Sequence, residues 1–258
     1  MFEKRGQATI YIVVIAVLVL AVFIMMYFQG EVKGSFRGAT EKELTIEDRN
    51  VAAYIQSCLD LTAKNGLFFL GFVGGRLNPD PFGLYYHYDE SYKVAYFYIE
   101  GKNNIPVPYQ EAYWTGLLDR YMKNYFEGCI GNFQSFPISV VKGKFSSKTS
   151  FTDESVIFNI QYPVTINRDG KKVELDPKYT ATVPVRLREM LFVASTIVEK
   201  EVSNDQFIHW DYLTQVTQKQ YNITAYTEEE DTIVYRMIDL RNKIDNEPYI
   251  MQFANKVR

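Results

Sequence analysis

The stretch Ile10–Phe28, IYIVVIAVLVLAVFIMMYF, contains no charged residue, no proline and no glycine. Its polar groups are the hydroxyls of Tyr11 and Tyr27, which lie near the two ends, where Tyr rings favour the membrane–water interface. A helix of this length, at about 1.5 Å per residue, spans roughly the hydrocarbon core of a bilayer. It also pairs its own backbone N–H and C=O groups internally. The stretch therefore predicts a single transmembrane helix.

Two other interpretations of this stretch fit less well. A core helix of a soluble protein rarely lacks a polar face over such a length. A cleaved secretory signal peptide has an apolar region of about 7–15 residues that ends at a small-residue cleavage site. This run is longer and continues into Gln29-Gly30-Glu31-Val32. A retained membrane anchor is therefore expected.

The residues before the apolar run, Lys4-Arg5-Gly6-Gln7, resemble the class III signal peptide of archaeal pilins and archaellins. In those families a basic pair and a glycine precede the cleavage site, and the apolar helix stays on the mature chain. The resemblance implies a cut between Gly6 and Gln7 by a prepilin-type signal peptidase. The chain also resembles uncharacterised archaeal membrane proteins that begin in this way and continue with an extracytoplasmic α+β domain. Tyr11 stands where bacterial-type pilins usually have Glu, which disfavours filament assembly but not processing.

The charges that flank the apolar run are nearly balanced. Lys4 and Arg5 favour a cytoplasmic N-terminus, but Lys33, Arg37 and Lys42 follow the other end of the run. The positive-inside rule therefore decides little here. The expectation that the C-terminal domain is extracytoplasmic follows from the signal resemblance.

The chain is expected to consist of a leader (1–6), a transmembrane helix (7–29), a linker (30–44) and an α+β ectodomain (45–258). The ectodomain is long enough for one core or for two smaller subdomains, 45–135 and 136–258. Gly30, Gly34 and Gly38 punctuate the linker, and Gly costs about 1 kcal/mol relative to Ala inside a helix. The linker is therefore predicted to be a flexible joint, which suits a tethered domain better than a filament subunit.

Composition limits the partners and the compartment. The net charge of −3 gives no bulk attraction to nucleic acid. The chain has two cysteines, Cys58 and Cys129, and each falls on the apolar side of a predicted helix. Outside the cell such a pair persists as a disulfide. We expect that disulfide, with two buried free thiols as the alternative.

Helical periodicity predicts amphipathic helices in the ectodomain. The first runs from Thr45 to Asn65-Gly66. The second follows Pro106 and Pro108 and ends at Gly128 and Gly131, with Tyr121 and Tyr125 on its apolar face. The others run from Arg186 onward and from Ser203-Asn204-Asp205 to about Gln218. The apolar run 67–73 fits either a buried strand or a short helix.

Strand patterns fill most of the remaining ectodomain. They cover residues 84–88, 94–98, 138–144, 155–166, 172–175, 179–185, 221–226, 232–238 and 248–254. Asp169-Gly170 is a strong hairpin turn signal. The first two strands predict an aromatic hairpin, whose rings either pack in a half-buried sheet or form an exposed docking face. Strands alternating with pairs of helices predict an α+β fold with antiparallel sheet.

Motifs for catalysis or metal binding are missing from the sequence. His87 and His209 stand alone, without H-x-x-x-H, H-E-x-x-H, C-x-x-C, P-loop or G-x-S-x-G patterns. The acidic run Glu228–Asp231 lacks the spacing of a calcium loop and is expected to be a solvated turn. Asn222-Ile223-Thr224 fits the N-glycosylation acceptor. No catalytic residue, metal site or cofactor is expected.

The sequence therefore predicts a membrane-anchored cell-surface protein with a binding or envelope-structural role. Its expected partners are membrane lipid along Ile10–Phe28, the signal peptidase, and envelope or self-assembly partners, but not nucleic acid. Two alternatives remain open. One is a pilin-like filament subunit, and the other is a membrane-tethered hydrolase with His87 or His209 in a pocket beside a carboxylate and a Ser or Cys.

Overall fold

The computed structural model describes residues 46–75, 85–87, 93–105, 110–168, 170–203, 208–219, 221–229 and 231–257. The chain divides into two compact units, residues 1–44 and Thr45–Arg258, and every described residue lies in the second. The predicted leader with Lys4, Arg5, Gly6 and Gln7, the anchor and the linker lie outside the described residues. No described helix is both long and apolar enough to cross a membrane.

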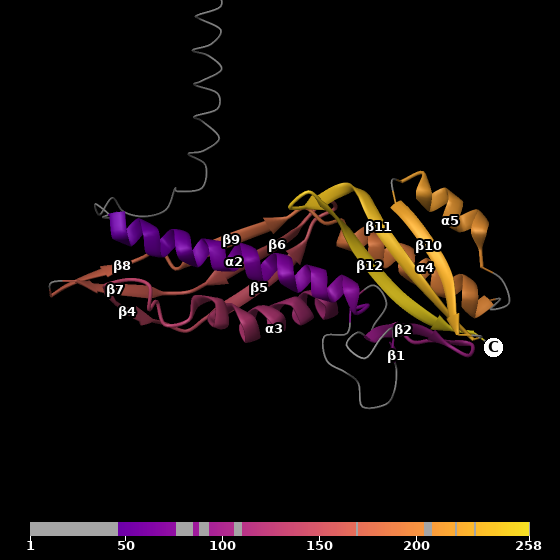
Figure 1. Ribbon diagram of the computed structural model, residues 1–258, viewed down its shortest axis with the longest axis horizontal. Helices are drawn as coiled ribbons and strands as arrows, with labels where there is room; N and C mark the ends of the chain where they lie inside the picture. The colour runs from indigo at the N-terminus through magenta and orange to yellow at the C-terminus, as the bar shows by residue number, and fades with distance from the viewer. Residues whose placement is uncertain are drawn as a thin grey trace, which may run out of the picture. The chain divides into compact units, whose positions relative to one another are not determined.

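The described unit is an α+β fold rich in antiparallel sheet, as predicted (Figure 1). Its elements in chain order are α2 (Ile46–Phe72), β1 (Tyr85–His87), β2 (Lys93–Ile99), β3 (Lys102–Asn103), α3 (Glu111–Ile130), β4 (Ser139–Lys142), β5 (Ser146–Phe151), β6 (Val156–Gln161), β7 (Val164–Arg168), β8 (Lys171–Glu174), β9 (Lys178–Val183), α4 (Leu187–Ser203), α5 (Trp210–Thr217), β10 (Tyr221–Glu229), β11 (Thr232–Ile244) and β12 (Glu247–Lys256).

Helix α2 is longer than its sequence pattern predicts. The prediction that Asn65-Gly66 ends the helix is wrong, and the ambiguous run 67–73 continues it. Gly66 stays helical because the ring of Tyr121 on α3 packs on it, so that a Cβ at this position would lie 2.8 Å from Tyr121 Cδ1. The helix is instead followed by Gly74 and Gly75, whose positive φ angles are a common way to end a helix. Gly66 therefore allows α2 and α3 to pack closely and does not end the helix.

Helices α2 and α3 are joined covalently. The predicted disulfide Cys58–Cys129 is confirmed, with its Cα atoms 5.7 Å apart. Beside it, the hydroxyl of Tyr54 donates a 2.8 Å hydrogen bond to the carbonyl of Cys129. Helix α3 ends before Gly131 as predicted, but Tyr125, expected on its apolar face, is 57% exposed. The bridge and the Tyr121–Gly66 contact together hold the two helices as a pair.

The larger sheet has the strand order β1-β2-β12-β11-β10, with β3 added beside β2. All neighbours are antiparallel except β2 and β12, which are parallel. The predicted aromatic hairpin is confirmed as β1–β2, and its described rings (Tyr85, Tyr86, Tyr96, Phe97 and Tyr98) are all buried. The interpretation of these rings as an exposed docking face is therefore wrong.

Helix α4 is tied to this sheet by buried polar contacts. The buried carboxylate of Glu201 accepts hydrogen bonds from the hydroxyl of Tyr235 and the amide of Asn255. At the other end, Arg186 forms a two-pronged ion pair with the fully buried Asp239, at 2.6 and 3.0 Å. Arg186 also lies over the ring of Tyr221, 4.2 Å from its centroid. These contacts fix α4 against β10, β11 and β12.

The middle of the chain forms three long, bent strands. Sheet β4-β7-β8 continues into sheet β5-β6-β9, because each strand of the first is joined through a short bend to a strand of the second. Residues 155–166, predicted as one strand, divide at Tyr162-Pro163, since Pro has no N–H to donate. The backbone bond from Gly143 N to the carbonyl of Pro163, 2.7 Å, bridges the bend. The β7–β8 hairpin at Asp169-Gly170 is confirmed by its register.

Several boundaries differ from the predictions at the C-terminal end. Helix α5 begins at Trp210 rather than after Ser203, and the predicted cap residues Asn204 and Asp205 lie outside the described residues. Strands β10, β11 and β12 are longer than expected. The pairing of β11 with β12 is irregular between Ile238 and Lys243. There the carboxylate of Asp239 accepts hydrogen bonds from the N–H groups of Arg241 and Asn242, and β11 therefore continues to Ile244.

Candidate functional site

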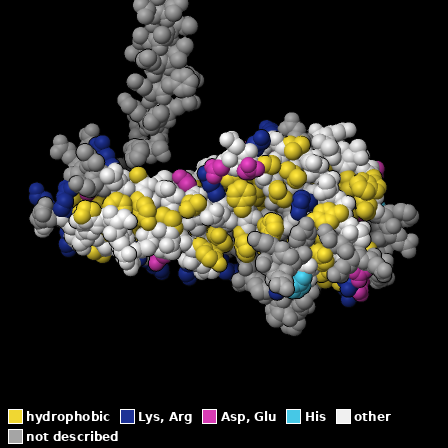
Figure 2. Space-filling model, viewed as in Figure 1, with side chains coloured by type: hydrophobic (Ala, Val, Ile, Leu, Met, Phe, Trp, Pro, Cys, Tyr) yellow, Lys and Arg dark blue, Asp and Glu magenta, His cyan; other side chains and the backbone are white. Residues whose placement is uncertain are grey.

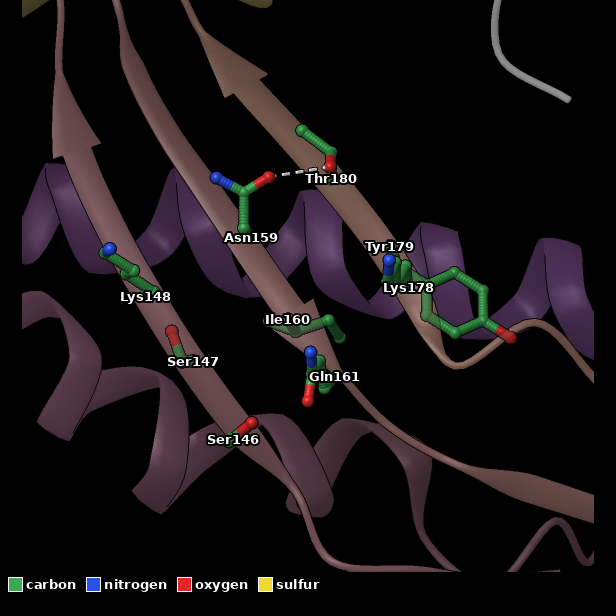
Figure 3. Close-up of a pocket in the computed structure, with 9 residues that line it drawn as sticks. All are labelled: Ser146, Ser147, Lys148, Asn159, Ile160, Gln161, Lys178, Tyr179 and Thr180. Atoms are coloured by element: carbon green, nitrogen blue, oxygen red, sulfur yellow. Dashed lines mark hydrogen bonds between the residues drawn. The ribbon is translucent and has the colours of Figure 1, made fainter. Parts of the chain in front are cut away.

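A hollow of about 370 Å³ lies on the sheet formed by β5, β6 and β9 (Figure 3), and it is called the polar hollow because seven of its nine lining residues are polar. Each strand contributes three neighbouring residues to its lining. They are Ser146, Ser147 and Lys148 from β5, Asn159, Ile160 and Gln161 from β6, and Lys178, Tyr179 and Thr180 from β9.

The strand register places the exposed lining residues in two rows across the sheet. Lys148 pairs with Asn159, which pairs with Thr180, and Ser146 pairs with Gln161, which pairs with Lys178. Residues two apart on a strand share a face, so both rows lie on the exposed side. The two lysines stand at opposite corners, and strand spacings of about 4.8 Å and 3.4 Å per residue put their Cα atoms roughly 12 Å apart.

The floor of the hollow is held by the two helices behind the sheet. The hydroxyls of Ser147 and Thr149 donate to one carboxylate oxygen of Asp119 on α3, at 2.8 and 2.7 Å. On the other edge, the amide of Gln56 on α2 donates to the backbone carbonyl of Thr180 at 3.0 Å. Both edge strands are therefore fixed, and the rows keep their spacing.

Asn159 occupies the centre of one row and has a defined orientation. The hydroxyl of Thr180 donates to its Oδ1 at 2.9 Å. Its Nδ2 consequently points away from β9 and toward β5, as Figure 3 shows. The hollow thus has an amide at its centre whose donor is directed toward β5.

The charge around the hollow is positive although the chain as a whole is acidic. Its lining contains two lysines and no carboxylate. Residues 139–183, which form the three bent strands, carry seven Lys or Arg against five Asp or Glu, a net charge of +2 in a chain of net charge −3. The arrangement attracts negative charge and offers hydrogen-bonding groups between the two cations.

Tyr179 is among the lining residues but supplies no acid or base to the hollow. Its side chain is on the inward face of β9, and burial, with Asp176 and Tyr162 adding to it, raises the pKa of the hydroxyl. The hydroxyl therefore stays protonated at physiological pH. The lining contains no His, Asp or Glu side chain that could act as a general base beside its serines.

The two histidines lie at different elements in the described part of the chain. His87 is exposed on β1, and His209 lies just before α5 with its Nε2 3.1 Å from the carbonyl of Lys200. Within the described residues, neither contacts a carboxylate or a hydroxyl, and no group of three or more metal-ligating side chains gathers.

The remaining predicted positions lie on the larger sheet. Asn222 is exposed on the edge strand β10, so its modification stays a prediction. The acidic run lies at the β10–β11 turn, where Asp231 pairs with Lys256 at 3.2 Å. Hydrogen bonds from Lys256 and Thr232 lower the pKa of the Asp231 carboxyl.

A second surface is apolar and lies along the α2–α3 pair (Figure 2). Leu61 is 52% exposed, Phe69 42% and Tyr125 57%. The ring of Tyr121 joins Phe69 to Tyr125, with centroid separations of 6.3 and 4.4 Å. This surface is built from helices, whereas the polar hollow is built from strands.

Sequence reasoning missed the hollow. Polar and apolar residues alternate over 158–161 and 178–181, which is the pattern of a sheet with one solvated face, but not over 146–150. That pattern was the available signal, but it does not show which strands pair. No protein family, curated protein or solved structure matches this chain.

Proposed function

We propose that the chain is a single-pass, membrane-anchored protein whose domain Thr45–Arg258 faces the outside of the cell and acts by binding. The Cys58–Cys129 disulfide is the observation that carries this proposal, because disulfides persist in oxidising compartments and are rare in the reducing cytosol. In this proposal the apolar run Ile10–Phe28 is the membrane anchor, and Lys4-Arg5-Gly6-Gln7 is the export signal and the site of its cleavage.

The described surface supports binding rather than catalysis as the activity of the domain. The polar hollow presents lysines, amides and hydroxyls on a rigid sheet, and rigid elements position binding groups better than loops do. The hydrolase alternative gains no support from His87 or His209, which the described structure leaves outside any acid–base pair.

A protease-protection experiment tests the location. Intact cells carrying the full chain with a C-terminal epitope are treated with an external protease, and we expect the epitope to be lost. Mass spectrometry of the membrane-bound chain is expected to find Gln7 as the first residue. The thiols of Cys58 and Cys129 are expected to resist alkylation until a reductant is added.

The controls for this experiment separate location from processing. Lysed cells show that the protease reaches the epitope, and a cytoplasmic marker shows that intact cells remain sealed. An epitope that survives in intact cells, together with thiols that alkylate without reductant, would place the domain in the cytosol and end the proposal. If the epitope is degraded but Met1 is still present, only the predicted cleavage between Gly6 and Gln7 is wrong, and the external location of the domain stands.

A second candidate function is a subunit of a pilus-like filament, and the apolar α2–α3 surface favours it. Exposed contiguous apolar side chains often mark contacts with another copy or partner. Electron microscopy of surface-sheared material from cells expressing the tagged chain tests this: tagged filaments support the candidate, and tag found solely in membranes argues against it.

A further inference from the structure

We infer that the polar hollow on β5, β6 and β9 binds an acidic saccharide, meaning a chain of sugars that carries carboxylates. The inference deepens the proposed binding role, on which it rests, by naming the ligand class of this surface. Three features carry it: the placement of the two lysines, the polar groups between them, and the absence of apolar, aromatic or arginine side chains from the outward rows.

The positions of the two lysines fit a ligand whose negative charges are separated along its length. Lys148 and Lys178 lie at diagonal corners, with a row of polar side chains on each side of the line joining them. A Lys ammonium is a point charge on a flexible stem, without the planar fork with which Arg grips a single phosphate or carboxylate. One carboxylate at each corner, on different sugars of the same chain, therefore fits the pair better than one compact anion at the centre.

The groups between the lysines suit hydroxyls. The Nδ2 of Asn159 donates toward β5, and the side chains of Gln161 and Ser146 both donate and accept hydrogen bonds. A sugar hydroxyl likewise both donates and accepts. The centre of the hollow therefore matches the uncharged part of a saccharide, while its corners match the acidic part.

Other anionic partners fit less well. Single-stranded nucleic acid is held by aromatic platforms and arginines, and the outward rows contain neither. A membrane surface is entered by apolar or aromatic side chains, but Ile160 and Tyr179 of this lining are on the inward, buried side of the sheet. An oligosaccharide lying across the strands uses every outward group without such contacts.

The test uses the full chain in nanodiscs of uncharged phosphatidylcholine, titrated with oligogalacturonate by calorimetry. Because the hollow is exposed, we expect binding in the high-micromolar to millimolar range, weakening as salt is raised. The double variant Lys148→Ala/Lys178→Ala is expected to bind about tenfold more weakly. Asn159→Asp, which places a carboxylate at the centre, is expected to abolish binding.

Lys171→Ala/Lys172→Ala is the matched control. It removes two exposed lysines from β8, on the same bent strands but outside the hollow, and is expected to change affinity less than twofold. Uncharged dextran and inorganic phosphate are expected to bind at least tenfold more weakly than oligogalacturonate. Thermal melts of each variant check that the exposed substitutions leave the fold intact.

Three results would overturn the inference. The first is no binding of oligogalacturonate at 50 mM salt. The second is an equal loss of affinity in the two double variants, because this would show that the ligand is attracted by the overall positive charge and not by the hollow. The third is equal or tighter binding of phosphate or of phosphatidylserine vesicles through Lys148 and Lys178. None of these results bears on the protease-protection experiment, so the failure of the ligand class and the failure of the proposed location are distinguishable.

Discussion

Reduction of the Cys58–Cys129 disulfide is expected to lower the free energy of unfolding by about 4 kcal/mol. The bridge joins cysteines 71 residues apart, and a cross-link over a loop of that length removes much of the conformational freedom of the unfolded chain. The measurement is a guanidinium unfolding curve of the full chain in detergent, followed by tryptophan fluorescence, with and without reductant. The reductant is expected to move the midpoint to a lower concentration.

The double variant Cys58→Ala/Cys129→Ala provides the control. It should unfold at the same midpoint with or without reductant, and close to the midpoint of the reduced wild type. We expect both reduced forms to stay folded in the absence of denaturant, because Gly66 still packs on Tyr121 and Tyr54 still bonds to the carbonyl of residue 129. A change below about 1 kcal/mol would mean that the unfolded chain keeps α2 and α3 together without the bridge.

Elements with strong local signals were predictable from the sequence. The turn Asp169-Gly170 fixed the β7–β8 hairpin, because Gly supplies the positive φ that a two-residue turn needs. The apolar stripe of α3 predicted Trp114, Leu117, Leu118 and Met122 of its buried face, but not Phe126 and Ile130. In both cases the signal lies within a few residues, and nothing distant overrides it.

The elements that were missed depend on contacts with distant parts of the chain. Strand β5, SSKTSF, has almost no apolar alternation, because Ser147 and Thr149 face α3 through hydroxyls bonded to Asp119. The turn between β11 and β12 is Asp245-Asn246, whose positive φ angles come without a glycine. The predicted end of α2 was wrong because Gly66 packs against Tyr121, which is 55 positions away in the sequence.

The candidate site could not be predicted for the same reason. Lys148, Asn159 and Thr180 lie far apart in the sequence and form a row only through the registers of two strand pairs. Each residue alone is an ordinary exposed strand residue. By contrast, the disulfide was predictable, because two cysteines allow a single pairing and each lay on the apolar side of a helix.

Raising the pH to 11 is expected to unfold the domain. Burial raises the pKa of five tyrosines that are at most 9% exposed, and that of Tyr162 reaches about 12; the others are Tyr179, Tyr221, Tyr235 and Tyr249. A tyrosine in the unfolded chain has a pKa of about 10. Because the folded pKa is the higher one, the stability is fully present below pH 10 and is lost as the pH rises toward the folded pKa.

The size of this loss is comparable to the whole stability of a typical domain. At pH 11 each buried tyrosine favours the unfolded state by about 1.4 kcal/mol, so that five together amount to about 7 kcal/mol, within the usual range of about 5–15 kcal/mol for domain stability. Circular dichroism of the full chain in detergent, recorded from pH 8 to 12, is expected to show a cooperative transition between pH 10 and 12.

Tyr162→Phe separates this cause from general alkaline damage. The buried hydroxyl of Tyr162 has no hydrogen-bond partner in the described structure, so its removal leaves no orphaned group and is expected to stabilise the domain by about 1 kcal/mol at pH 7. At pH 11 the variant should gain about 1.4 kcal/mol more, because one titrating group is lost. Tyr125→Phe, at the exposed surface of α3, is the matched control and should leave the alkaline midpoint in place. Equal midpoints for both variants and the wild type would show that buried tyrosines do not drive the transition.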